Sequence, residues 1–191
     1  MARWAPRQRA RPGARFNTRS LIVAVLLAGS IGFYIYKHWH APTLTTIIGS
    51  SRVIDGDTID IWSTRIRLEA IDAPELDQTC DDSDGRPWSC GSVAARELRR
   101  HVNGHELKCE PSRYDQFKRV LAICFRPDGS DVNAWMVRQG WALAFRSTTR
   151  YRAAQDEAAA AKRGLWAGGF ITPWDWRQRE ARRTGAVLDT D

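Results

Sequence analysis

The chain has 191 residues, enough for one domain with a hydrophobic core and an appendage. Its formal net charge of +7 belongs to the N-terminal segment, where residues 1–19 hold six arginines and no acidic residue. Residues 44–191 hold 22 of the 29 basic residues and all 22 acidic residues, and are formally neutral. This distribution excludes a domain that attracts nucleic acid through a global positive field, and leaves room only for a local positive groove.

An uncharged segment follows the arginines. Residues 20–36 are 17 residues without a charge, which is at the short end of a membrane span. Because arginines precede it, the positive-inside rule places the N-terminus in the cytoplasm and the rest of the chain outside. We therefore predict a basic cytoplasmic tail (1–19), a transmembrane signal-anchor (20–36), a linker (37–42) and a periplasmic domain on the bacterial inner membrane.

Two alternatives remain for this segment. A cleaved signal peptide would end its apolar core near residues 28–30, whereas this chain stays apolar for six more residues and has no clear small-x-small cleavage site. Cleavage would make the protein secreted. The other alternative is a helix buried in the fold.

The chemistry of the chain is concentrated in residues 53–75. Apolar residues alternate with polar ones over 59–61 and 66–70, which is typical of half-buried strands, and the short break between the two runs predicts a hairpin. Turning it about Ser63 and Thr64 places Asp57 opposite Ala70, so that Asp57 and Asp72 converge at the open end. Arg67 lies on the second strand, and Glu75 follows Pro74 on the exit loop.

Clustered carboxylates beside an arginine indicate a particular chemistry. Hard oxygen ligands suit Ca²⁺ or Mg²⁺, and a guanidinium suits a phosphate oxyanion. The combination favours metal-assisted phosphoester chemistry, with one carboxylate left to act as a base for water. The alternative is a salt-bridged hairpin with an Asp-Gly turn at residues 55 and 56.

At these residues the sequence resembles the thermonuclease family, whose best-known member is staphylococcal nuclease. The resemblance runs from about residue 43 to residue 166 and rests on Asp-Gly-Asp-Thr at 55–58 and Arg-x-x-x-x-Asp-x-Pro-Glu at 67–75. It implies a calcium-dependent phosphodiesterase that acts on DNA, RNA or both. The roles that it implies are metal ligation by Asp57, Asp72 and the Ala73 carbonyl, phosphate binding by Arg67 and Arg119, and general-base catalysis by Glu75.

The segment before Arg119 departs from the family pattern. Relatives commonly have Lys-Tyr-Gly or Arg-Tyr-Gly where this chain has Gln116, Phe117 and Lys118, which we expect to contact substrate. Phe117 can stack on a base or can be an aromatic at the hairpin tip. An alternative function is a non-catalytic OB-type module that binds nucleic acid, although retention of three carboxylates favours the enzyme. No protein partner is inferred.

Four cysteines lie beyond the apolar segment, an even number that fits an oxidising compartment. Cys80 and Cys90 flank a polar loop, and Cys109 and Cys124 lie in two strands that a turn near residues 116–117 would set opposite each other. We predict the bridges Cys80–Cys90 and Cys109–Cys124. A zinc site is the rival, but no Cys-x-x-Cys pair is present.

The other elements complete an α+β pattern. We expect a first strand over 43–54, strands at 106–110 and 120–125, and helices over 92–103, 132–139 and 151–162, capped by Ser92 in the first case and Asp131 in the second. The resemblance implies that the strands close into a five-stranded OB-like β-barrel with about three packed helices, after one transmembrane helix. We place the nuclease-like domain at 43–179, where Trp174 and Trp176 pack back on the barrel, and a flexible tail at 180–191.

Overall fold

The computed structural model describes residues 18–39 and 44–185, and the chain divides into two units between residues 43 and 44. The first unit contains helix α1 (Thr18–Trp39), which includes the apolar segment where we expected a membrane anchor. Within the described residues, no helix combines the length and the apolarity needed to cross a membrane. The anchor and the location that it implies stay predictions, and most of the basic tail and linker lies outside the described residues.

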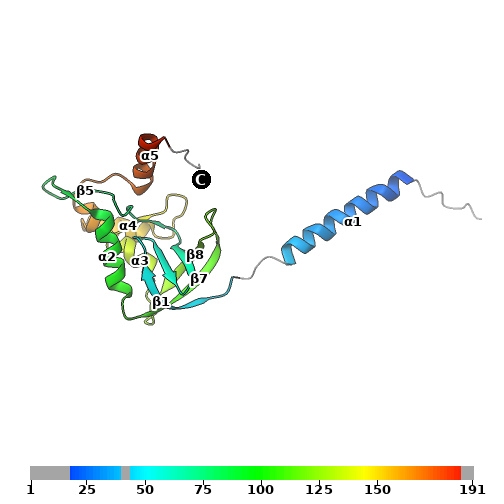
Figure 1. The fold of residues 1–191 in the computed structure, drawn as a ribbon, viewed down its shortest axis with the longest axis horizontal. Coiled ribbons are helices and arrows are strands. Elements are labelled where there is room, and N and C mark those ends of the chain that lie inside the picture. Colours follow the sequence, from blue (N-terminus) through cyan, green and yellow to red (C-terminus); the bar gives the residue numbers. More distant parts are fainter. Residues whose placement is uncertain (1–17, 40–43, 186–191) are drawn as a thin grey trace, which may run out of the picture. The chain divides into compact units, whose positions relative to one another are not determined.

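The second unit is built on a closed barrel of five strands in the order β1-β2-β3-β8-β7 (Figure 1). These strands are β1 (Ile47–Val53), β2 (Thr58–Ile61), β3 (Thr64–Leu68), β7 (Glu106–Tyr114) and β8 (Val120–Phe125). Neighbours are antiparallel except β3 and β8, which are parallel. Alternate residues such as Ile59, Ile66 and Leu107 are fully buried inside. The predicted five-stranded barrel is confirmed.

The hairpin formed by β2 and β3 is tighter than we expected. Thr58 pairs with Arg67, and the Leu68 N–H donates to the Asp57 carbonyl at 2.7 Å, so Asp57 lies opposite Leu68 and the predicted partner Ala70 is wrong. The turn comes earlier because Trp62 adopts a left-handed φ of 55°. Ala70, with φ 67°, has already left the strand. The chain bends there into β4 (Ile71–Asp72), which pairs with β9 (Leu143–Ala144) and brings Asp72 back towards Asp57.

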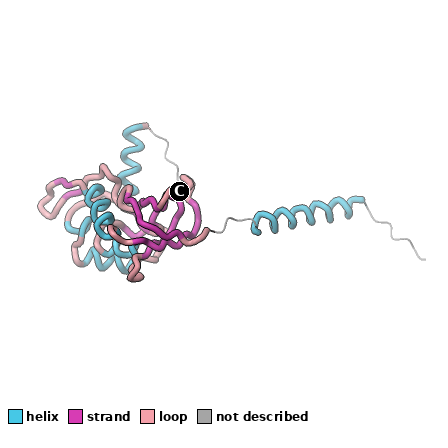
Figure 2. Tube along the Cα trace, turned by 60° about the horizontal axis from the view of Figure 1, so that its bottom comes forward, coloured by secondary structure: helices cyan, strands magenta, loops and turns pink. Residues whose placement is uncertain are grey.

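The helices of the second unit gather on one side of the strands (Figure 2). They are α2 (Cys90–Val102), α3 (Val132–Arg138), α4 (Arg152–Ala160) and the 3-10 helix η1 (Gly164–Ala167), while one further helix, near the C-terminus, stands apart from them (Figure 1). The Asp131 cap is confirmed, because its carboxylate accepts from the Ala134 N–H at 2.8 Å. The Ser92 cap is wrong: α2 begins two residues earlier, and the Ser92 hydroxyl donates to the Leu76 carbonyl instead.

Both predicted disulfides are present. Cys80–Cys90 joins β5 (Cys80–Asp81) to the start of α2 across a small hairpin with β6 (Pro87–Trp88). Cys109–Cys124 joins directly paired residues of β7 and β8 inside the barrel, where both cysteines are fully buried.

The C-terminal part contains a helix that the sequence pattern did not predict. Helix α5 (Pro173–Thr184) begins with a proline in its first turn, and the Thr172 hydroxyl caps it by accepting from the Asp175 N–H at 3.2 Å. Residues 180–184, which we assigned to a flexible tail, are therefore helical. Residues 186–191 of that tail lie outside the described part of the chain.

Candidate active site

The barrel edge brings together the two aspartates that we expected to bind a metal. Asp57 precedes β2 and Asp72 ends β4, and both are buried, with 4% and 6% of their surface exposed. The backbone at Gly56 explains the close approach, because a Cβ atom there would lie 2.6 Å from the Ala73 Cβ. A side chain would clash at this crossing, so the glycine of the Asp-Gly-Asp motif lets Asp57 lie against the loop that follows β4.

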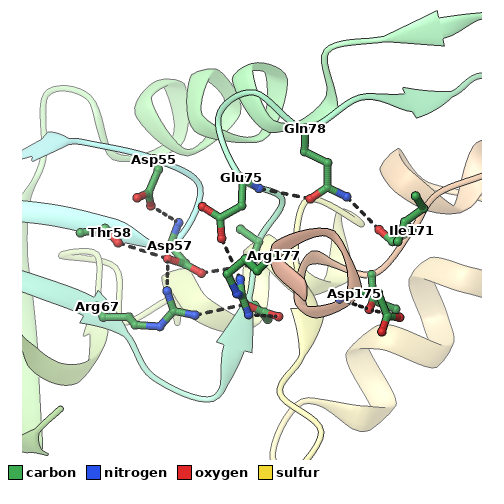
Figure 3. A network of polar contacts seen from close by, with 12 residues as sticks. Asp55, Asp57, Thr58, Arg67, Glu75, Gln78, Ile171, Asp175 and Arg177 are labelled. Carbon is green, nitrogen blue, oxygen red and sulfur yellow. Dashed lines mark hydrogen bonds and ion pairs between the residues drawn. The ribbon is translucent and has the colours of Figure 1, made fainter. Parts of the chain in front are cut away.

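Arg67 holds both aspartates with one guanidinium, and Figure 3 shows its contact with Asp57. Its Nη1 lies 2.7 Å from Asp57 Oδ1, and its Nη2 lies 3.1 Å from Asp72 Oδ1. The second oxygen of Asp57 accepts from the Ala73 N–H at 3.1 Å. Two buried carboxylates that share one planar cation face the same point, which is the geometry expected of a binding site for a cation.

A second arginine enters the site from α5. Arg177 Nη1 and Nη2 lie 3.1 Å from the two oxygens of Asp72, and Nη1 lies 2.7 Å from Glu75 Oε1. Figure 3 shows Glu75 pointing towards this guanidinium. The sequence analysis missed Arg177. The signal was Thr172 before Pro173, a cap followed by a proline in the first turn, which predicts a helix start rather than a tail.

Arg119 approaches from the hairpin between β7 and β8. Asp115 holds it, accepting from Arg119 Nε at 2.7 Å and from the Phe117 and Arg119 N–H groups. Arg119 lines a cavity of about 920 Å³ together with Asp57, Arg67 and Glu75. Gln116 and Phe117 also line this cavity, whereas Lys118, predicted to contact substrate, does not, because its left-handed φ of 62° belongs to the hairpin turn.

Burial and charge shift several pKa values at the site. Burial, together with repulsion from Asp57, raises the pKa of Asp55 to about 6. Burial also raises the pKa of Asp72, although Arg177 and Arg67 oppose this shift. Burial alone would lower the pKa of Arg177, but the Asp72 and Glu75 carboxylates raise it above its usual value. Both guanidinium groups therefore stay charged beside the carboxylates.

The donor set suits a hard divalent cation even though its oxygens are engaged by arginines. Within residues 18–39 and 44–185, no group of three or more His, Cys, Asp or Glu side chains is arranged to hold a metal ion. The reason is visible in the contacts: Arg67 and Arg177 donate to the oxygens of Asp57, Asp72 and Glu75. Carboxylate oxygens are the ligands that a hard divalent cation prefers, but a cation that binds here has to share or displace these guanidinium contacts.

The comparison with known families decides the relationship. A profile described as staphylococcal nuclease homologue matches residues 65–168, more than half of the chain.

The chain belongs to the staphylococcal nuclease homologue family.

Relatives of this staphylococcal nuclease homologue carry several names. The succinoglycan biosynthesis protein ExoI of Rhizobium meliloti (strain 1021) is 37% identical over 123 residues, which cover 63% of this chain and 64% of that protein. An uncharacterized endonuclease of Escherichia coli is 35% identical over 137 residues, covering 68% of this chain and 83% of the relative. The micrococcal nuclease of Shigella flexneri is 30% identical over 151 residues, covering 70% and 81%.

The profile does not reach every group at the site. Arg67, Asp72, Glu75 and Arg119 lie within the matched residues, whereas Asp57 precedes them and Arg177 follows them. Beside Arg177, the sequence analysis missed Gln78, which is completely buried, accepts from the Glu75 N–H at 3.3 Å and donates to the Ile171 carbonyl at 2.8 Å. Gln78 thus ties the Glu75 loop to the segment that leads into α5.

Proposed function

We propose that this chain is a calcium-dependent nuclease that hydrolyses phosphodiester bonds of DNA, RNA or both. Membership of the family makes it a nuclease that acts on nucleic acids. The observation that supports the finer assignment is the convergence of Asp57, Arg67, Glu75 and Arg119 on one cavity, from a turn, a strand, a loop and a hairpin that are separate in the sequence.

Each group has a role that its surroundings suit. Asp57, Asp72 and the Ala73 carbonyl would hold the ion, and the chemistry that bound calcium supplies is neutralisation of negative charge on a phosphoryl oxygen. Arg67 and Arg119 both line the cavity, and their planar guanidinium groups can donate hydrogen bonds to the other phosphoryl oxygens. Glu75, the least buried of the three carboxylates, is the base for water, since its side chain is 39% exposed.

The test is cleavage of supercoiled plasmid and of RNA by the full chain in calcium, followed by addition of EGTA. We expect cleavage that stops with EGTA, and a fall of about 10²–10⁴ in rate for Glu75→Gln, the range typical of a lost general base. Asp77→Asn is the matched control, because Asp77 is an exposed acid on the same loop. Binding without cleavage would favour the non-catalytic module, and a Glu75→Gln protein as fast as wild type would contradict the assignment.

Export and membrane attachment complete the proposal. The support is the six arginines before an uncharged segment, together with two disulfides in the second unit, which oxidising compartments favour. We expect the full chain in the membrane fraction after alkaline washing, and a chain that starts at residue 44 in the soluble fraction. Equal partitioning of the two would contradict the anchor.

A further inference from the structure

Arg177 occupies the carboxylate oxygens that the proposed metal would need. It donates to both oxygens of Asp72, at 3.1 Å each, and to Glu75 Oε1 at 2.7 Å. Asp72 Oδ1 also accepts from Arg67. The Asp72 side chain is 9% exposed, so little water competes for these oxygens. A divalent ion at Asp72 would therefore meet a guanidinium already in place.

Arg177 makes the polar contacts that join helix α5 to the rest of the second unit. Within the described residues, every hydrogen bond and ion pair that joins α5 to another element comes from Arg177. Only Pro173 and Ala181 of the helix are buried. Trp174 adds a packing contact, because the Arg146 guanidinium lies 3.9 Å from its ring centroid. The docking of α5 thus depends on the carboxylates of the active site.

We propose that Arg177 is an internal cation that competes with the divalent metal for Asp72 and also holds the general base Glu75, so that metal binding releases α5 from the active site. This inference rests on the metal site of the proposed function and adds a regulatory contact to it. Arg177 and Trp174 both line the active-site cavity, so release of α5 also opens that wall to substrate.

Charge explains why the two cations exclude each other. Asp57, Asp72 and Glu75 carry three negative charges, and Arg67 and Arg177 already supply two positive ones. Asp55 also lines the cavity, so the exclusion is local: a divalent ion at Asp72 would lie beside the Arg177 guanidinium that already binds both oxygens of that carboxylate, and repulsion between cations so close together is strong in a partly buried site. Arg177 is the group that can leave, because its helix has few other anchors, whereas Arg67 lies on a barrel strand.

Thermodynamic linkage gives the proposal two readouts. If docked Arg177 weakens calcium binding by some factor, calcium must weaken the docking of α5 by the same factor. The first readout is the calcium Kd, and the second is hydrogen exchange of the α5 amides, which reports local opening. Neither readout requires catalytic activity.

The experiment uses calorimetric calcium titration of the full chain as wild type, Arg177→Ala, Arg177→Lys and Arg179→Ala. Arg179 is the matched control, because it is an exposed arginine on the same helix. We expect Arg177→Ala to lower the calcium Kd about tenfold, within the 5–150-fold range of typical couplings. We expect Arg177→Lys to lower it less, since lysine keeps the charge but loses the two-pronged contact. Arg179→Ala should match wild type.

Hydrogen exchange of wild type forms the second arm. We expect calcium to speed exchange in residues 173–184 and to have little effect there in Arg177→Ala, whose helix is already loosened. An unchanged or higher calcium Kd in Arg177→Ala would overturn the proposal, because Arg177 would then organise the metal ligands rather than compete. Slower α5 exchange in calcium would overturn it too.

The two proposals fail in different ways. Calcium-dependent cleavage by wild type, with the same calcium Kd in Arg177→Ala, would overturn only the competition. A wild-type chain that neither binds calcium nor needs it for cleavage would overturn the proposed function, and the competition with it.

Discussion

Two arginines with the same proposed role lie in different surroundings. Arg67 is 18% exposed and stands between the buried carboxylates of Asp57 and Asp72. Arg119 is 24% exposed and binds Asp115 of its own hairpin turn, whose carboxylate also accepts from two backbone N–H groups. The loss of Arg67 would leave the buried Asp57 carboxylate without its cation, although Asp72 would keep Arg177, whereas Asp115 keeps backbone partners without Arg119.

We therefore expect Arg67→Ala and Arg119→Ala to lose similar amounts of activity but different amounts of folding stability. Each should lose about 3–4 kcal/mol of transition-state stabilisation, or ~10²–10³ in rate, as for other lost oxyanion donors. In EGTA, Arg67→Ala should also lose about 3–5 kcal/mol of folding free energy, because it breaks a buried ion pair from one side. Urea unfolding checks this, and calcium should restore part of the loss. Equal urea midpoints for the two variants would contradict the distinction.

His101 gives the fold a dependence on pH that is independent of the active site. Its ring stacks on Trp135 with centroids 3.8 Å apart, and its buried Nε2 atom has no hydrogen-bond partner. Burial, with repulsion from Arg126, lowers the pKa of His101 to about 4. The folded protein therefore binds fewer protons than the unfolded chain between pH 6.5 and about 4, so stability falls as the pH is lowered through that window.

His101→Phe should flatten this dependence, because phenylalanine keeps a flat ring against Trp135 and cannot take up a proton. For one proton the wild-type slope can reach about 1.4 kcal/mol per pH unit, and partial exposure of the ring makes it smaller. Urea midpoints measured from pH 7.5 to pH 4.5 give the comparison. An identical slope in His101→Phe would contradict the assignment.

At the scale of elements, the two disulfides have different structural roles. Cys80–Cys90 closes 10 residues and Cys109–Cys124 closes 15, so each contributes about 3 kcal/mol in the chain-entropy picture. The first also secures the start of α2 against the loop that carries Glu75: a Cβ atom on Gly91 would lie 1.6 Å from the Glu75 carbonyl oxygen. Its loss should loosen the position of Glu75 as well as the fold.

We expect the Cys80→Ser/Cys90→Ser chain to lose kcat as well as stability, and the Cys109→Ser/Cys124→Ser chain to lose stability alone. The second pair lies inside the barrel, away from the residues that line the cavity. Both variants should be assayed at a temperature where circular dichroism shows them folded. Equal kcat values for the two would remove the special role of the Cys80–Cys90 bridge.

The sequence predicted an element correctly where local contacts determine its bounds, and less well where contacts distant in the sequence determine them. The bounds of β8 and the Asp131 cap of α3 follow from alternation and capping, which are local signals, and both were predicted correctly. The predicted register of the β2–β3 hairpin was wrong by two residues. Its turn contains Trp62 with a left-handed φ, and tryptophan is not among the residue types that indicate such a turn. The closed barrel came from the family resemblance, because alternation does not say which strands pair.

The site was predictable as a set of residues and less so as a set of contacts. Asp57, Asp72, Arg67 and Glu75 lie within 19 residues, so a hairpin and one loop bring them together. Arg177 bonds Asp72 from 105 residues away, and Gln78 reaches Ile171 across 93. Such contacts depend on where α5 docks, and no pattern within α5 specifies that position. The roles of the site residues stay predictions until variants are assayed.

At the scale of the whole molecule, positive charge and catalysis belong to different parts of the chain. Residues 1–19 contribute six arginines, while residues 44–191 are formally neutral. The nuclease unit can therefore release few counterions when it binds nucleic acid, mainly at the arginines around its cavity. The basic tail should dominate non-specific binding whenever it can touch the polymer.

This separation predicts two salt dependences for single-stranded DNA binding, measured without calcium to prevent cleavage. The chain that starts at residue 44 should show a shallow slope of log affinity against log salt, close to −0.7 for each of about two or three phosphate contacts. The full chain in detergent should be steeper by up to about 4, because six more arginines can each neutralise a phosphate. A full chain with these arginines replaced by glutamine should return to the shallow slope, with the same kcat at saturating substrate. Equal slopes for the full and shortened chains would mean that the nuclease unit itself makes the phosphate contacts, despite its balanced charge, and would contradict this prediction.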